Sequence, residues 1–306
     1  MSDVAVIIST DKEDMTRQNI ATHCDTATYR DIVVVGASAG GIEALQTLVA
    51  GLPETFGAAM LVVLHIPAHS PSQLHHILSK PGVLPVKPAE NGEPIVLGQI
   101  YVATSDRHLI VEEDHIRVTR GPKENRVRPA VDTLFRSVAY RFGSRVIGVV
   151  LSGMLDDGTA GLWTIKDHGG TTIVQSPQDA LFSSMPESAL QHVAVDYTLP
   201  VAKMPALLTK LTSETIATNN QIASSKAIEL ETQIALESNA LRGGAMQLGP
   251  VSANTCPECH GVLVRIREGK IIRYRCHTGH AYSLQTLLAE VNKEIDATVM
   301  GGIASH

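Results

Sequence analysis

Residues 31–45 read DIVVVGASAGGIEAL, and the pattern within them is the strongest indication of the fold. It opens with four consecutive aliphatic residues, 32–35, which is typical of a strand buried on both faces of a sheet. Small residues follow at 36–41, and helical apolar spacing begins beyond them. In open α/β folds, ligands and catalytic groups gather at the turn between such a strand and its helix. Ser38 stands in this turn, where the free N–H groups of the helix start stabilise negative charge. The stretch therefore predicts an α/β fold and a candidate serine nucleophile.

Two other interpretations of this turn are a close-packing device and a dinucleotide-binding fingerprint. Small residues alone would let the strand and the helix pack closely. The fingerprint G-x-G-x-x-G would need glycine at position 38 and an acidic residue at the end of the next strand. The next apolar run, residues 60–64, ends instead in His65, which is a poor ribose ligand and a good general base. Ser38 and His65 together favour a nucleophilic site.

Length and composition indicate a globular chain with one large domain and a smaller additional unit. The chain has 306 residues with a hydrophobic content of 44%, enough for a large core. A net charge of −6, without any block of Lys and Arg, argues against nucleic acid as a partner. We find no signal peptide and no apolar run of about 18 residues, so the sequence predicts a cytoplasmic protein without membrane insertion.

Apolar strands alternate with amphipathic helices across residues 30–212, which predicts a mostly parallel sheet sandwiched by helices in three layers. The predicted strands are 31–35, 60–64, 100–103, 109–111, 115–119, 146–151, 171–174 and 197–199. The predicted helices are 40–50, 71–80, 130–141, 159–168, 185–191 and 202–212. Prolines and short strands interrupt the alternation at 81–120, where we expect a β-rich excursion with an antiparallel hairpin.

Three segments flank this domain. Residues 1–29 are predicted to be a partly ordered leader, in which Cys24 is an incidental thiol. Residues 213–250 are rich in small and polar side chains, carry a helical apolar stripe, and are predicted to be a partly helical linker. Residues 251–300 hold the other three cysteines and end in a predicted helix over about 281–297.

A serine site of this kind also needs a carboxylate that orients the histidine. The run IGVVLSGMLDDGTAGL, residues 147–162, offers Asp156 and Asp157 directly after a predicted buried strand. Both would lie on the same sheet edge as Ser38 and His65. An Asp-Gly pair is usually only a turn or a helix cap, and the spacing alone does not choose between the two aspartates.

Residues 31 to about 205 resemble the catalytic domain of the CheB-type chemotaxis protein-glutamate methylesterases. The matching stretches, in the family's order, are VVVGASAGGIEAL, LVVLHIP, GEPIVLGQIYVATSDRHL, RPAVDTLFRSVA, GVVLSGMLDDGTAGL and MPESAL. The resemblance implies an α/β fold and a Ser-His-Asp mechanism, with Ser38 as nucleophile, His65 as base and Asp157 as the histidine's partner. The family's aspartate lies immediately before the glycine and three residues after the methionine, which selects Asp157 over Asp156.

The resemblance also implies the reaction and its partner. Ser38 would attack the γ-methyl ester of a glutamate on a methylated chemoreceptor, with candidate oxyanion-hole N–H groups around Ala39 and Met154. Deamidation of glutamine shares the tetrahedral intermediate and is a further expected activity. Arg126 and Arg128 are candidates for holding an acidic receptor helix, with ordinary surface charge as an equal alternative. No cofactor is expected for catalysis.

The sequence departs from the best-known members of that family in two places. Those members carry a receiver domain that blocks the esterase until it is phosphorylated, and the short stretch before residue 31 predicts that this control is absent in cis. A separate signalling or receiver protein is the expected regulator. Leu155 and Asp156 stand where glycine or alanine is more common, which would alter the rim of the site and leave its three central residues in place.

The C-terminal segment contains a metal-binding pattern. Cys256 and Cys259 form C-P-E-C, while Cys276 and His280 belong to C-H-T-G-H, which gives C-x2-C-x16-C-x3-H. Two such knuckles joined by a β-prone hairpin predict a tetrahedral Cys3His zinc site in a zinc-ribbon-like module. Four protein ligands leave no open position, so the zinc would be structural, and its removal would leave the esterase active.

Two interpretations compete with this ligand set. His277 or His260 could replace the histidine ligand, although adjacency to a ligating cysteine makes chelation by His277 awkward. The three cysteines could also stay reduced without metal. Similar CPxC…CxxGHAYS tails follow some receiver-less esterase domains of the family, and GHAYS stands here at 279–283.

Two functions of other classes fit parts of the sequence. The chain could be a serine esterase outside chemotaxis, or a non-catalytic signalling scaffold whose tail and linker bind a partner. The combination of Ser38, His65 and Asp157 argues against the scaffold. Covalent labelling of Ser38 by a fluorophosphonate would separate the scaffold from both enzymes.

Overall fold

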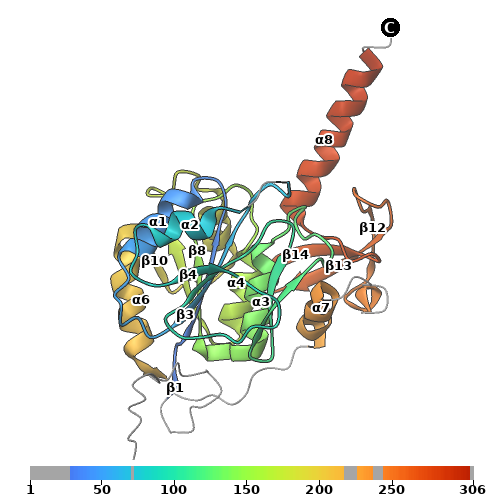
Figure 1. Cartoon of the computed structure of the whole chain (residues 1–306). Coiled ribbons are helices and arrows are strands. Elements are labelled where there is room, and N and C mark those ends of the chain that lie inside the picture. Colours follow the sequence, from blue (N-terminus) through green and yellow to red (C-terminus); the bar gives the residue numbers. More distant parts are fainter. Residues whose placement is uncertain (1–27, 70–71, 217–225, 237–243, 304–306) are drawn as a thin grey trace, which may run out of the picture.

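The computed structural model describes residues 28–69, 72–216, 226–236 and 244–303, with side chains as far as residue 293 (Figure 1). Cys24 and nearly all of the predicted leader lie outside the described residues. Within the described ranges, no helix combines the length and the apolar character needed to cross a bilayer.

A seven-stranded sheet forms the centre of the large domain, and every strand pair in it is parallel. The strand order is β10-β9-β8-β2-β3-β5-β4. The bounds are β2 (Ile32–Ala37), β3 (Ala59–Leu64), β4 (Val86–Pro88), β5 (Ile100–Val102), β8 (Val146–Val150), β9 (Thr171–Gln175) and β10 (Tyr197–Leu199). The central position of β2, between β8 and β3, explains why its residues are apolar without interruption.

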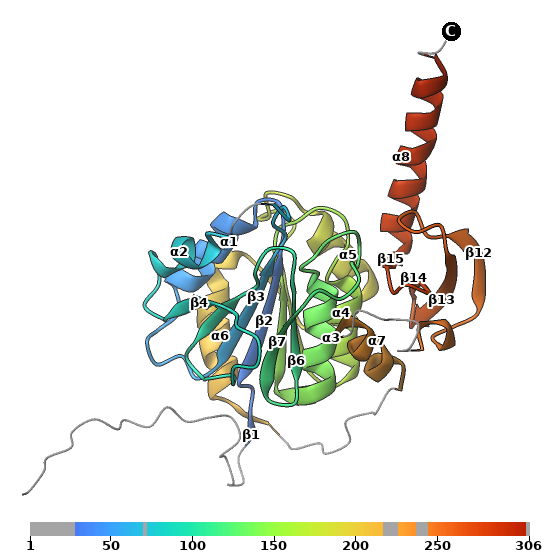
Figure 2. The same ribbon diagram turned by 45° about the vertical axis from the view of Figure 1, so that its right-hand side comes forward.

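Helices cover both faces of the sheet and give the predicted three layers (Figure 2). One face carries α1 (Gly41–Ala50), α2 (Leu74–Ser79) and α6 (Met204–Ser213), and the other carries α3 (Val131–Phe142), α4 (Thr159–Asp167) and α5 (Ser184–His192). Alternate residues of β2 point to the two faces. Ile32 and Val34 pack with α3, whereas Val33 and Val35 pack with α1. The fold class predicted from the sequence is confirmed.

The segment from 81 to 120 differs from its prediction. Only β6 (His108–Glu112) and β7 (His115–Thr119) form a separate antiparallel hairpin. The two preceding strands, β4 and β5, join the main sheet in parallel, so the expected β-rich excursion is wrong for them. These strands have three residues each, too few to show a period, and β4 ends in Pro88 at the sheet edge, where proline is tolerated.

Several short elements complete the chain. Strand β1 (Thr28–Tyr29) pairs antiparallel with β11 (Thr215–Ile216), beside the large domain. Among the described residues, short 3-10 turns occupy η2 (Gly143–Arg145), η3 (Val201–Lys203) and η4 (Ala245–Gln247). Helix α7 (Lys226–Leu236) confirms a helix in the predicted linker. It lies against α3 and the β6–β7 hairpin, where the Thr119 hydroxyl donates to the Ala235 carbonyl at 2.7 Å.

The C-terminal module, residues 251–303, is a four-stranded antiparallel sheet followed by a helix that projects away from the large domain (Figures 1 and 2). Its strands are β12 (Val251–Thr255), β13 (Val262–Glu268), β14 (Ile271–Cys276) and β15 (Ala281–Ser283), and its helix is α8 (Leu284–Ile303). The predicted hairpin is confirmed as β13–β14. The helix begins at Leu284 and not at 281, because residues 281–283 pair with β14.

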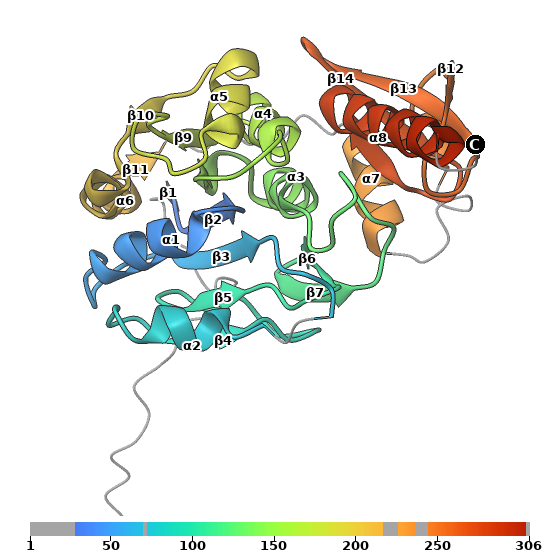
Figure 3. The same ribbon diagram turned by 90° about the horizontal axis from the view of Figure 1, so that it is seen from above.

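Seen from above, the module and α7 lie together on the α3 side of the large domain (Figure 3). Five buried charged residues join these parts and form what we call the buried ion cluster: Glu124, Arg136, Glu231, Arg273 and Arg275. Arg275 Nη2 lies 2.6 Å from Glu124 Oε1 and 2.9 Å from Glu231 Oε1. Arg273 holds the other oxygen of Glu231 at 2.6 Å. Glu231, on α7, therefore connects the module to the large domain.

Burial opposes the charge on Glu231, but Arg273 and the other arginines of the cluster hold the pKa of this carboxyl well below its usual range. We expect Glu231→Ala to lower the free energy of unfolding by about 3–5 kcal/mol, because it leaves buried guanidinium groups without a counter-charge. Glu229→Ala, at an exposed position of the same helix, is the matched control and should change little. Urea denaturation measures both. Equal effects of the two substitutions would contradict this role of the cluster.

Candidate active site and metal centre

The turn after β2 presents Ser38 at the carboxyl edge of the sheet. Its main-chain N–H donates to the Ser152 carbonyl at 2.9 Å, which ties the turn to the segment after β8. Gly40 has a φ of 69°, and a side chain there would come within 2.8 Å of both Leu181 and Ser152. Glycine is required at this position by conformation and by space. The sharp turn leaves Ser38 just before α1 begins at Gly41.

His65 and Asp157 meet Ser38 because β8, β2 and β3 are adjacent in the sheet. His65 Nδ1 lies 3.1 Å from Ser38 Oγ, and its Nε2 lies 2.7 Å from Asp157 Oδ2. With Asp157 ionised, Nε2 carries the proton and donates it to the carboxylate, which leaves Nδ1 to accept from the serine hydroxyl. The structure thus brings the three predicted residues into one hydrogen-bonded chain.

The carboxylate of Asp157 is almost completely buried, with 3% of the residue exposed. Its oxygens accept hydrogen bonds from the main-chain N–H groups of Val131 at 2.7 Å, Asp132 at 3.2 Å and Gly158 at 3.1 Å. The first two belong to the N-terminus of α3, whose dipole favours an anion. Burial acts to raise the pKa of Asp157, but the bonds from His65, Val131 and Asn125 outweigh it and lower the pKa to about 2. Asp157 is therefore ionised when His65 acts as a base.

The neighbouring Asp156 faces the C-terminal module. Its Oδ1 accepts from the hydroxyls of Ser283 at 2.8 Å and Thr286 at 3.2 Å. Leu155, just before it, has a φ of 62°, so the chain turns sharply before the two aspartates. Burial raises the pKa of Asp156, and the charge of Asp157 adds to this effect. The geometry assigns contact with His65 to Asp157 and not to Asp156.

Main-chain donors near Ser38 Oγ differ in their availability. The N–H groups of Ser38 and Gly153 are already engaged, with the carbonyls of Ser152 and Phe182 respectively. Across the part of the chain that the structure describes, the N–H groups of Ala39 and Met154 have no protein acceptor. These are the two donors that the sequence singled out for an oxyanion.

The open side of His65 borders a cavity of about 360 Å³. Arg126 and Arg128 both line it, and both are already paired. Arg128 Nη2 lies 2.6 Å from Asp106, and Arg126 forms an ion pair with Glu290 of α8. The second pair means that the C-terminal module reaches the mouth of the candidate active site.

Two residues without a role in the sequence analysis belong to this site. Asn125 Nδ2 donates to Asp157 Oδ1 at 3.0 Å and to Asp132 Oδ2 at 3.2 Å. Asp132 also accepts from the main-chain N–H groups of Gly158 and Gly161. The local signal for Asp132 was its place in the first turn of a predicted helix, where an acidic residue is common for the helix dipole alone. Asn125 gave none, because its partners lie far away in the sequence.

The four predicted metal ligands converge in the C-terminal module. One ligand atom from each of Cys256, Cys259, Cys276 and His280 lies within 4.8 Å of all the others. Cys256 Sγ is 3.6 Å from His280 Nδ1, and Cys259 Sγ is 3.6 Å from Cys276 Sγ. Ligands at 2.0–2.3 Å around a tetrahedral zinc are separated by about 3.3–3.8 Å, so this donor set fits such an ion. The cluster could hold a metal.

Comparison with known proteins decides the family of the large domain. The sequence model of the CheB methylesterase family matches residues 33–208. The chain belongs to this family. The match covers Ser38, His65 and Asp157 and ends before α7 and the C-terminal module.

Relatives within the CheB methylesterase family agree with this assignment. A protein of Leptospira interrogans (strain 56601) is 38% identical over 182 residues, which cover 59% of this chain and 94% of that protein. The protein-glutamate methylesterase/protein-glutamine glutaminase 2 of Anaeromyxobacter dehalogenans is 39% identical over 182 residues, and the match spans 53% of its length. The crystal structure of the Thermotoga maritima CheB methylesterase catalytic domain is 36% identical, with a TM-score of 0.57, over 98% of that domain and 59% of this chain.

The two aspartates give a direct test of the geometry. We expect Asp157→Asn to lower kcat on the order of 10³- to 10⁴-fold, because the imidazole loses its orienting anion. Asp156→Asn should have a small effect, because its partners are hydroxyl donors and an amide oxygen can still accept from them. Steady-state rates of ester hydrolysis by both variants check this expectation. Equal losses of kcat would contradict the assignment of Asp157 as the partner of His65.

Proposed function

We propose that this chain is a protein-glutamate methylesterase that restores glutamate from its γ-methyl ester on methyl-accepting chemoreceptors. The observation that carries the proposal is the chain of contacts from Ser38 Oγ through His65 to the Asp157 carboxylate. Family membership and the names of the relatives support the same reaction. The relatives' names also include glutaminase, which supports deamidation of receptor glutamine as a second activity.

The reaction begins when Ser38 Oγ attacks the ester carbonyl and His65 Nδ1 takes the hydroxyl proton. The resulting oxyanion would be held by the N–H groups of Ala39 and Met154. The tetrahedral intermediate collapses as His65 returns the proton to the leaving methoxide, and methanol departs. A water then attacks the acyl-enzyme by the same proton route, which releases the glutamate carboxylate and regenerates Ser38. Asp157 stabilises the imidazolium in both steps.

Methanol release from a methylated receptor preparation tests this function. We expect Ser38→Ala and His65→Ala each to abolish release, and the double variant to be about as inactive as either single variant, since these residues act as one unit. Ammonia release from unmodified receptor reports deamidation in the same samples. Turnover by Ser38→Ala clearly above the uncatalysed rate would rule out the nucleophile. Full wild-type labelling of Ser38 by a fluorophosphonate with no receptor hydrolysis would point to an esterase outside chemotaxis.

We further propose that Cys256, Cys259, Cys276 and His280 hold one structural zinc. The apolar core of the module is small, consisting mainly of Leu263, Tyr274, Tyr282 and Leu287 beside the thiols. Bound metal would supply much of its folding free energy, on the order of 10 kcal/mol in isolated zinc modules.

Elemental analysis of anaerobically purified protein should give one zinc per chain. Cys259→Ser should lose this zinc, whereas His277→Ala should keep it, because His277 is not among the four clustered ligands. Wild-type protein without zinc would refute the site. Loss of zinc from His277→Ala but not from Cys259→Ser would refute the ligand set.

A further inference from the structure

The C-terminal module is hydrogen-bonded to the loop that supports Asp157. The main-chain N–H of Asn125 donates to the Ala281 carbonyl at 2.8 Å, and the N–H of Ala281 donates to the Lys123 carbonyl at 3.1 Å. The N–H of Ser283 donates to the side-chain Oδ1 of Asn125 at 2.8 Å. Residues 123–125 of the large domain therefore pair with β15, and the last residue of β15 bonds to the side chain that contacts Asp157.

The amide of Asn125 has only one orientation that satisfies its surroundings. Its NH2 group faces the carboxylates of Asp157 and Asp132, which accept, and its oxygen faces the N–H of Ser283, which donates. A flipped amide would place an oxygen against the ionised carboxylate of Asp157 and an NH2 group against the N–H of Ser283. The N–H of Ser283 and the aspartates thus favour the same orientation, in which Asn125 stabilises the charge on Asp157.

The candidate metal centre lies at the other end of β15. Cys276 ends β14 and His280 immediately precedes β15, so two of the four clustered ligands flank the turn that leads into this strand. The hydroxyl of Tyr282 lies 3.3 Å from Cys256 Sγ. A path of direct contacts therefore runs from the cysteine cluster through β15 and Asn125 to Asp157.

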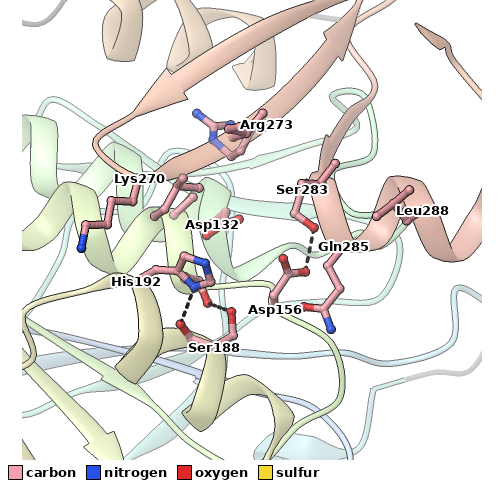
Figure 4. Close-up of a pocket in the computed structure, with 14 residues that line it drawn as sticks. Asp132, Asp156, Ser188, His192, Lys270, Arg273, Ser283, Gln285 and Leu288 are labelled. Carbon is pink, nitrogen blue, oxygen red and sulfur yellow. Dashed lines mark hydrogen bonds between the residues drawn. The ribbon is translucent and has the colours of Figure 1, made fainter.

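Polar contacts at this interface lie beside a cavity. A cavity of about 280 Å³ lies between the module and the large domain, bordered by Asp132, Asp156 and Ser283 (Figure 4). The Ser283 hydroxyl points to Asp156 across its edge (Figure 4). If β15 loses its order, the side-chain oxygen of Asn125 loses the hydrogen bond that the Ser283 N–H donates to it.

We propose that Asn125 is a positioning residue for Asp157, and that the hydrogen bonds from the C-terminal module hold Asn125 in place and thereby support the activity of the esterase. This proposal rests on the proposed function of Ser38, His65 and Asp157. It differs from the sequence-based expectation of a metal centre that serves only the module. An intact module becomes a condition for rapid catalysis.

Two substitutions at position 125 separate the side chain from the backbone. Asn125 has a φ of 49°, so Asn125→Gly removes the amide without straining the left-handed backbone. Asn125→Asp keeps the acceptor for Ser283 and places an oxygen against Asp157 in place of the NH2 group. We expect kcat for methanol release to fall about 10- to 100-fold in Asn125→Gly and further in Asn125→Asp, with KM for the receptor unchanged. The rate of fluorophosphonate labelling of Ser38 should fall in parallel.

Cys259→Ser tests the role of the module from within the candidate metal centre. Zinc content is its first readout. The fluorescence of Trp163, the single tryptophan of the chain, is the second, because its ring lies against Gly269 at the tip of the β13–β14 hairpin. We expect Cys259→Ser to change the zinc content and the Trp163 fluorescence and to lower kcat about 10-fold or more. His277→Ala should match the wild type in zinc content, fluorescence and kcat.

The double variant Asn125→Gly/Cys259→Ser distinguishes positioning from general destabilisation. If the module acts through Asn125, the cysteine substitution should lower kcat no further once Asn125 is removed, whereas independent effects would multiply. Wild-type kcat in Asn125→Gly, with Ser38→Ala inactive, would overturn this inference and leave the proposed function standing. Wild-type kcat in Cys259→Ser after loss of zinc, or multiplied losses in the double variant, would overturn the role of the module. An active Ser38→Ala would overturn the proposed function itself.

Discussion

The buried negative charge of Asp157 is the constraint on which the candidate active site depends. A carboxylate removed from water is unstable unless donors replace its hydration shell. Here those donors come from the residue after β3, from the N-terminus of α3, and from the loop that contains Asn125. Because these donors belong to separate segments, the anion fixes the positions of the segments relative to one another. One result is that the imidazole of His65 is oriented.

A second set of buried charges fastens the remainder of the chain to the same loop. Glu124 belongs to the buried ion cluster, and its neighbour Asn125 belongs to the support of Asp157. Buried ion pairs contribute little net stability compared with apolar packing, but they tolerate few alternative arrangements. We infer that the cluster mainly specifies how the module docks. The family match ends at residue 208, so Glu231, Arg275 and Ser283 lie outside the part shared with the family model.

The C-terminal module also contacts residues at the mouth of the candidate active site. Glu290 pairs with Arg126, and Glu258 of the module lies 3.7 Å from Lys123. Both basic residues line the cavity beside His65. An acidic substrate segment would meet cations that already have internal partners. The module therefore contacts both the support of Asp157 and the basic side of the entrance.

The sequence by itself determined the features that arise from neighbouring residues. The uninterrupted apolar run at 32–35 specified a central strand, and the small residues after it specified the turn that presents Ser38. Parallel strands end at one edge, so Ser38, His65 and the Asp156–Asp157 pair could be brought together from their positions after apolar runs. Cys256 and Cys259 are close together in the sequence, as are Cys276 and His280, so their spacing could be read as two halves of a metal site. Their ligand atoms do converge.

Features that depend on contacts between distant segments could be read only from the folded structure. Spacing alone did not separate Asp156 from Asp157, and only the family resemblance favoured Asp157. Their contacts separate them: Asp157 bonds to a histidine 92 residues away, and Asp156 bonds to a serine 127 residues away. Strands β4 and β5 were too short to show their place in the parallel sheet. The role of Asn125 depends on Ser283, 158 residues further along, and neither residue carries a local signal. Hydrogen bonds of this kind have no periodicity in the sequence, because they form only after the sheet and the module have folded against each other.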